Sequence, residues 1–109
     1  MAEDVISRLA ATIRSRREAS VAASYTRTLL DGGPARCARK LGEEATETII
    51  AALAEDDAKL AAEAADLVYH LLVLLEARGV EWQAVESILT ARQGTSGHDD
   101  KRTRSDARG

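Results

Sequence analysis

The chain has 109 residues, of which 45% are hydrophobic and 30% are charged, and its formal net charge is −3. This length suits one domain with a small core. The negative charge argues against a nucleic-acid-binding module, because such modules hold phosphates with clustered Lys and Arg. With one cysteine, no apparent export signal and no long apolar run, the sequence predicts a cytoplasmic protein without an intramolecular disulfide.

The composition predicts an all-α fold, because alanine dominates the apolar residues, phenylalanine is absent and there is one proline. Asp4 is a suitable N-cap for a first helix over about 5–18, which carries one apolar stripe. The basic residues at its end, Arg14, Arg16 and Arg17, are interpreted as a solvated helix terminus.

Three longer helical segments follow, and each has recognisable boundary residues. Before them, Ser24, Tyr25 and Thr26 begin a short turn or helix, which we expect to end at 31–33. The longer helices are predicted at 34–54, 57–78 and 81–92. Because the connection between 54 and 57 is short, the two helices that it joins should be antiparallel neighbours. Residues 1–94 are predicted to form the domain, and the polar segment 95–109 a flexible tail.

Two pairs of acidic residues occupy successive helices. Glu44 and Glu47 are one turn apart on the helix over 34–54, and Glu63 and Asp66 share the apolar stripe of the helix over 57–78. Buried carboxylates are costly without a partner, and the simplest compensation for four that face one another is a divalent cation. Since every candidate ligand is an oxygen, Mg²⁺ is favoured, with Mn²⁺ as an alternative. A di-iron centre lacks its expected Glu-x-x-His signature.

A Mg²⁺ ion held by a few carboxylates keeps positions open for water and substrate phosphates, so the pattern indicates phosphate chemistry. Lys40, Arg36 and Arg39 lie on or near the same side of the helix and are candidates to contact further phosphate charge. His70 has two readings that the sequence leaves open. It is either a hydrogen-bonded core residue or a partner that orients Asp66 or Glu63.

The two acidic patterns resemble the metal site of the all-α, MazG-like nucleotide pyrophosphohydrolases. The wider sequence is similar to the phosphoribosyl-ATP pyrophosphohydrolase family of histidine biosynthesis. The segments that carry this resemblance are SYTRTLLDGGPARCARKLGEEATETIIAAL, EAADLVYHLLVLLEARGV and RQGTSG, and together they extend from Ser24 to Gly97.

The resemblance implies a four-helix, bundle-like fold completed by homodimerisation, and hydrolysis of phosphoribosyl-ATP to phosphoribosyl-AMP and pyrophosphate. It also implies Mg²⁺ ligands at Glu44, Glu47, Glu63 and Asp66, with Glu43 or Glu47 as the base and Lys40 stabilising phosphate charge. The remaining substrate contacts that it implies are Ser24, Tyr25, Thr26, Arg36, Arg92, Gly94, Ser96 and Gly97.

Two other functions are compatible with parts of the sequence. A house-cleaning nucleoside triphosphate pyrophosphohydrolase of the same fold would share the acidic site, but not the SYT and RxGxSG segments. A non-enzymatic helical dimerisation module would carry the same acids as solvated side chains. The partners expected are a small-molecule substrate and a second copy of the chain, without nucleic acid or a membrane.

Overall fold

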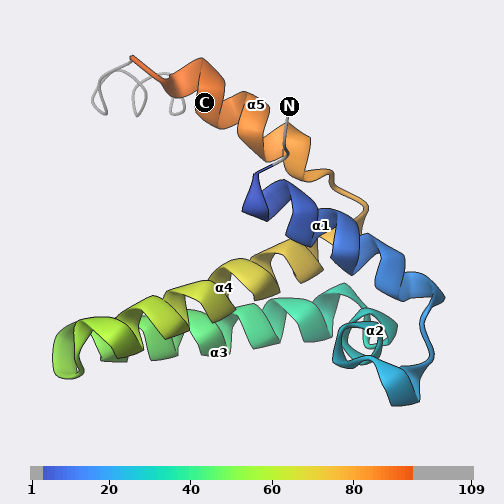
Figure 1. Cartoon of the computed structure of the whole chain (residues 1–109), viewed down its shortest axis with the longest axis horizontal. Helices are drawn as coiled ribbons and strands as arrows, with labels where there is room; N and C mark the ends of the chain where they lie inside the picture. The colour runs from blue at the N-terminus through green and yellow to red at the C-terminus, as the bar shows by residue number, and fades with distance from the viewer. Residues whose placement is uncertain (1–3, 95–109) are drawn as a thin grey trace.

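The computed structural model of the protein describes residues 4–94 and is all-α over that range (Figure 1). No strand occurs among these residues, and none of their helices is long and apolar enough to cross a membrane. The predicted tail, 95–109, lies outside the described residues. The elements are α1 Val5–Ser15, η1 Arg16–Glu18, η2 Val21–Ala23, α2 Tyr25–Asp31, α3 Gly33–Ala54, α4 Asp57–Arg78 and α5 Trp82–Arg92.

Helices α3 and α4 form an antiparallel hairpin that is the longest part of the molecule (Figure 1). The boundaries of α4 agree with the prediction, because both of its ends have strong local signals. The Asp56 carboxylate accepts a hydrogen bond from the backbone N–H of Lys59 at 2.9 Å. Gly79 ends the helix in the left-handed conformation, with a φ of 73°.

The structure differs from the prediction at the end of the first helix, whereas the short helix predicted after it is present. The first helix stops at Ser15, and 16–18 continue as a 3-10 turn. The SYT segment begins a two-turn helix, α2, because the Ser24 hydroxyl accepts from the backbone N–H of Arg27 at 3.1 Å. The described residues therefore contain five α-helices, and a single chain does not form a closed four-helix bundle (Figure 1).

The buried core is small and lies where α1 and α2 meet the hairpin. Its buried members are Ile13 from α1, Leu29 from α2, Cys37 from α3, and Leu72 and Val73 from α4. Cys37 is a free cysteine and is buried in this core. This core fixes α2 against the end of the hairpin at which α3 begins.

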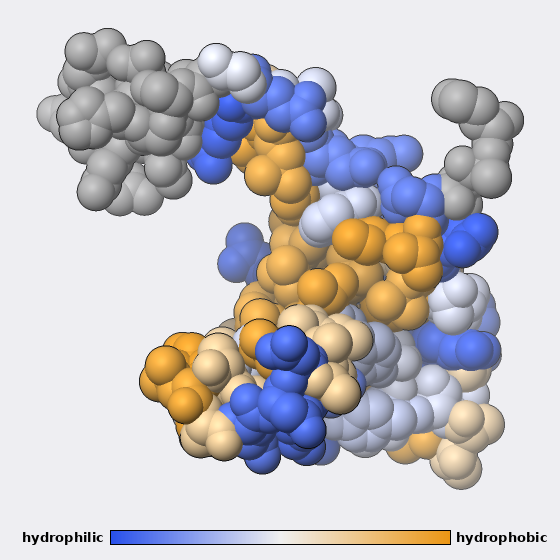
Figure 2. Space-filling view, turned by 60° about the vertical axis from the view of Figure 1, so that its left-hand side comes forward, coloured by the Kyte–Doolittle hydropathy of each residue, from blue (hydrophilic) through white to orange (hydrophobic). Residues whose placement is uncertain are grey.

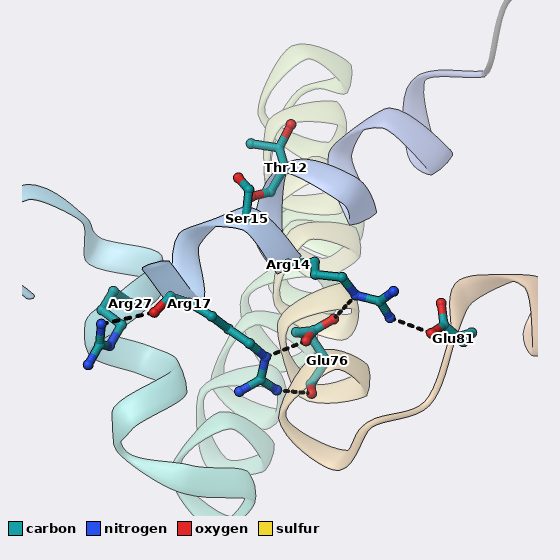
Figure 3. A network of polar contacts seen from close by, with 7 residues as sticks. All are labelled: Thr12, Arg14, Ser15, Arg17, Arg27, Glu76 and Glu81. Atoms are coloured by element: carbon teal, nitrogen blue, oxygen red, sulfur yellow. Dashed lines mark hydrogen bonds and ion pairs between the residues drawn. The ribbon is translucent and has the colours of Figure 1, made fainter. Parts of the chain in front are cut away.

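An ion-pair cluster joins α1 to the C-terminal part of α4 (Figure 3). Arg14 Nε lies 3.2 Å and Arg17 Nε lies 2.5 Å from the two oxygens of Glu76, whose side chain is 11% exposed. Arg14 also reaches Glu81, at 2.5 Å. Arg14 and Arg17 are exposed, at 53% and 46%, as expected of a solvated helix end, and they also form ion pairs that the sequence did not predict. They neutralise a carboxylate of another helix that is mostly removed from solvent.

Groups of large aliphatic side chains remain exposed on α3 and on α5. They are Ile49, Ile50 and Leu53 of α3 and Ile88 and Leu89 of α5, and Leu53 is 83% exposed. Figure 2 shows hydrophobic surface on the end of the hairpin that faces the viewer. The apolar stripe of α3 thus extends beyond what one chain covers.

Candidate active site

Three of the four predicted metal ligands meet between α3 and α4. Glu44, Glu63 and Asp66 each offer a carboxylate oxygen, and these oxygens lie within 4.8 Å of one another. Glu63 is buried, with 7% exposure, Glu44 is half-buried and Asp66 is exposed. The antiparallel hairpin brings the two acidic pairs together, and Asp66 keeps the cluster open to solvent.

Two oxygens in this cluster have no hydrogen-bond donor. Glu44 Oε2 and Glu63 Oε2 are both buried and without a partner in the structure. A buried carboxylate oxygen without a donor is unfavourable, so these atoms match a site that a cation completes. The oxygen donors are those that Mg²⁺ and Mn²⁺ prefer, and the residues present therefore fit such an ion.

Glu47, the fourth predicted ligand, lies beside Glu63 and is exposed to solvent. The neighbouring Glu63 carboxyl group raises the pKa of Glu47, and the nearby charge of Glu44 raises it further. Glu47 is not in the group of three oxygens that converge most closely. It adjoins that group from the side nearer the α3–α4 connection.

Lys59 contacts the cluster, although the sequence reasoning did not single it out. Its Nζ lies 3.1 Å from Glu63 Oε1, so the two oxygens of Glu63 have different surroundings. The hydrogen bond from Lys59 lowers the pKa of Glu63 below its ordinary value. The spacing of four residues on one helix was the available signal for this pair.

Thr48 fixes the distance between the two helices at the cluster. Its hydroxyl lies 2.8 Å from the main-chain carbonyl oxygen of Glu44 and 3.2 Å from that of Glu63. The hydroxyl, with one proton to donate, thus lies between a carbonyl oxygen of α3 and one of α4, at the turns that carry Glu44 and Glu63. This residue was also missed, since a threonine inside a helix gives no distinctive sequence signal.

His70 is buried, with 6% exposure, and its Nδ1 lies 2.8 Å from the main-chain oxygen of Asp66. Because a carbonyl oxygen only accepts, Nδ1 donates in this contact. The ring packs edge-on against Tyr69, with a centroid separation of 4.9 Å, and against Tyr25 at 6.5 Å. His70 thus contacts the backbone of Asp66 rather than its carboxylate, and its Nε2 has no partner in the structure.

The predicted substrate-binding residues of α2 and α3 lie on the side of the acidic cluster that is farther from the α3–α4 connection. Lys40 Nζ lies 3.3 Å from Glu43 Oε1, and this hydrogen bond raises the pKa of Lys40, with smaller contributions from nearby Tyr25 and Glu44. Tyr25 is 55% exposed. The Thr26 hydroxyl lies 2.5 Å from the hydroxyl of Tyr69. A cation and hydroxyl groups therefore border the acids on the side of α2.

The remaining residues that were predicted to contact phosphate or substrate lie on the exposed side of α3, at the end of α5 or after it. Arg36 and Arg39 are exposed on α3, and the stem of Arg36 packs closely on Gly32. Arg92 is the last residue of α5, whose C-terminal end points away from the hairpin in this chain, and Gly94 follows it (Figure 1). Ser96 and Gly97 lie outside the described residues. One chain therefore does not bring Arg92 and Gly94 to the acidic cluster.

A separate pocket of about 290 Å³ lies between α1, the C-terminal part of α4 and the start of α5. Its lining includes Arg14, Glu76, Glu81 and Trp82. The charged groups there, Arg14, Glu76 and Glu81, already pair with one another, and none of the predicted metal ligands lines the pocket. The acidic cluster is therefore the better candidate for chemistry.

Comparisons with known proteins agree with the sequence resemblance. The family described as phosphoribosyl-ATP pyrophosphohydrolase matches residues 6–93 of the chain. A phosphoribosyl-ATP pyrophosphatase of Nitrobacter winogradskyi is 57% identical over 96 residues, which cover 88% of this chain and 83% of the relative. Those of Caulobacter vibrioides and Azorhizobium caulinodans are 54% and 48% identical, covering 93% and 95% of this chain and 94% and 97% of the relatives.

Proposed function

The chain belongs to the phosphoribosyl-ATP pyrophosphohydrolase family, and from this premise we propose how its residues carry out the reaction. It hydrolyses phosphoribosyl-ATP to phosphoribosyl-AMP and pyrophosphate in histidine biosynthesis. The observation that carries our proposal is the convergence of Glu44, Glu63 and Asp66, with two buried oxygens that lack donors. The cytoplasmic location expected from the sequence stays a prediction.

In this proposal Glu44, Glu63 and Asp66 hold a Mg²⁺ ion, and Glu47 completes the set or contacts a bound water. When bound, the ion supplies charge neutralisation at the phosphate oxygens and lowers the pKa of a coordinated water. The Thr48 hydroxyl keeps the two ligand-bearing turns at a fixed separation. The hydrogen bond from Lys59 lowers the pKa of Glu63 and so favours its charged form.

Two glutamates are candidates to accept a proton from the attacking water. Glu43 forms an ion pair with Lys40, whose Nζ lies 3.3 Å from Glu43 Oε1. Glu47 is exposed, adjoins Glu63 and has a raised pKa, which suits a group that takes up a proton. We therefore assign the base to Glu47, and a smaller role to Glu43, which holds Lys40 in position.

Substrate phosphates would be held by cations at the α2 end of the cluster. Lys40 and Arg36 carry the positive charge, and Ser24, Tyr25 and Thr26 supply hydroxyl groups nearby. Arg92, Gly94, Ser96 and Gly97 would reach the site from a second subunit or through a change in position.

We also propose that the protein is a homodimer. The exposed side chains Ile49, Ile50 and Leu53 on α3, and Ile88 and Leu89 on α5, are the large apolar groups that a second copy would cover. Joining two hairpins would also complete the four-helix arrangement that a single chain lacks.

The test is pyrophosphate release from phosphoribosyl-ATP, measured with Mg²⁺ and with a chelator, and compared with release from dUTP. We expect turnover only with phosphoribosyl-ATP and Mg²⁺, and a loss of about 100-fold or more in Glu63→Gln. The control Glu86→Gln changes a carboxylate of α5 and should leave the rate unchanged. Comparable turnover of dUTP would favour the house-cleaning enzyme, and no turnover at all would favour the dimerisation module.

A further inference from the structure

Lys59 is the cation closest to the proposed metal ligands. Its Nζ lies 3.1 Å from Glu63 Oε1, and Glu47 and Glu55 are the other carboxylates near enough to raise the pKa of Lys59. The Lys59 side chain is 52% exposed, whereas that of Glu63 is 9% exposed. The flexible partner of this pair is thus the lysine, and the fixed partner is the glutamate.

The two lysines in the described part of the chain have different positions relative to the cluster. Lys40 binds Glu43, an exposed residue outside the set of three converging acids. Lys59 binds Glu63, the most buried member of that set. Glu63 therefore offers one oxygen to an ammonium group, while its other oxygen is buried without a donor.

We propose that Lys59 is a positioning residue that acts as a displaceable counter-cation of Glu63 and thereby lowers the affinity of the site for divalent ions. This inference rests on the metal site of the proposed function. Without an ion, the ammonium group offsets part of the repulsion among four neighbouring carboxylates. With an ion bound, the ammonium group and the ion are two positive charges beside the same carboxylate group, and they repel each other.

Electrostatics gives the direction and the size of the effect. Removing one positive charge beside a divalent ion at the protein surface should strengthen binding of the ion by about tenfold. A Lys–Glu pair four residues apart on a helix could instead serve only to stabilise that helix. In that case, loss of the lysine would lower thermal stability and leave the affinity for metal unchanged.

The experiment measures Mn²⁺ binding by electron paramagnetic resonance at pH 8, using the full-length protein and its variants. We expect Lys59→Met to bind Mn²⁺ about tenfold more tightly than the wild type, and Lys59→Arg to stay within about twofold. Lys59→Gln serves as a second neutral variant if Lys59→Met folds poorly. Arg78→Met removes the same charge from the same helix, about 22 Å from Glu63 and well beyond the Debye length, and should not change the affinity.

Thermal melting gives an independent readout. Without metal, Lys59→Met should melt below the wild type, and saturating Mn²⁺ should raise its Tm by more than it raises that of the wild type. Unchanged or weaker Mn²⁺ binding in both neutral variants would overturn the role of Lys59 and leave the metal site intact. Absence of Mn²⁺ binding in the wild-type protein would overturn the metal site and this inference together.

Discussion

Glu43 and Glu44 are adjacent in the sequence but differ in environment. Glu43 is exposed and paired with Lys40, whereas Glu44 is half-buried and has an oxygen without a donor. The difference follows from the 100° step between residues on a helix, which turns Glu44 toward α4 and Glu43 away from it. This difference is the reason why we propose Glu44 as a metal ligand and Glu43 as a residue that positions Lys40.

Replacing Glu44 by Gln should raise stability and abolish function. An amide in place of Glu44 removes one negative charge and can donate to Glu63, so we expect the metal-free protein to gain about 1 kcal/mol. Pyrophosphate release should fall by about 100-fold or more, because a ligand is lost. Calorimetry with and without Mg²⁺ measures the change in stability. Mg²⁺ should raise the Tm of the wild type and leave that of the variant unchanged.

Glu43→Gln is the matched control on the neighbouring residue. It should keep most of the Mg²⁺-dependent rise in Tm, because Glu43 is outside the converging group. A loss of metal-dependent stabilisation in Glu43→Gln equal to that in Glu44→Gln would contradict the assignment of ligands.

At the scale of elements, α1 is attached to α4 by charged groups in addition to apolar packing. Glu76 accepts from Arg14 and Arg17, and Arg17 also donates to the main-chain oxygen of Glu76 at 2.6 Å (Figure 3). Arg27 of α2 donates to the main-chain oxygen of Arg17 at 3.0 Å. These contacts extend from α4 through η1 to α2, and they stabilise the segment that leads to Ser24.

Glu76→Gln should destabilise the protein by about 1–3 kcal/mol, because two guanidinium groups lose a charged acceptor that is mostly buried. Glu81→Gln is the control, since Glu81 is 54% exposed and should contribute about 1 kcal/mol or less. Urea unfolding at pH 7 measures both. Equal effects of the two substitutions would contradict the special role of Glu76.

The contribution of Glu76 should depend on pH. Burial alone would raise the pKa of Glu76, but hydrogen bonds and charge from Arg17 and Arg14 lower it below its ordinary value. A carboxyl group with a lowered pKa stabilises the fold above its unfolded pKa of about 4.3 and loses that effect as the pH falls through the folded pKa. The stability difference between wild type and Glu76→Gln should therefore be full at pH 7 and shrink below about pH 4.

Helices with strong local signals were predictable from the sequence, and tertiary details were not. Asp56 and Gly79 mark both ends of α4, and the prediction of 57–78 is confirmed. The helical wheel identified Glu44, Glu63 and Asp66 as facing acids. It did not separate Glu47 from that group, because the angle at which two helices cross is set by packing. The Arg14 and Arg17 pairs were missed since their partner, Glu76, is about 60 residues away.

At the scale of the whole molecule, the chain has little core for its length, and its hairpin has an uncovered apolar side. Five residues from four helices make up the buried cluster. Exposed Ile and Leu side chains occur on α3 and on α5, the helix that extends away from the hairpin (Figures 1 and 2). Such surfaces on a small protein are typical of subunits that associate.

Leu53→Glu should convert the dimer that we propose into monomers. Leu53 is 83% exposed in one chain, so a glutamate there costs the monomer fold little, whereas in an apolar interface it would be buried as an unpaired charge. We expect the dissociation constant to rise by about 100-fold or more, as sedimentation velocity over a range of protein concentrations would measure. Val21→Glu, at a 49% exposed position in η2, is the control and should leave association unchanged. A Leu53→Glu protein that sediments as the wild type does would exclude this face of α3 from the interface.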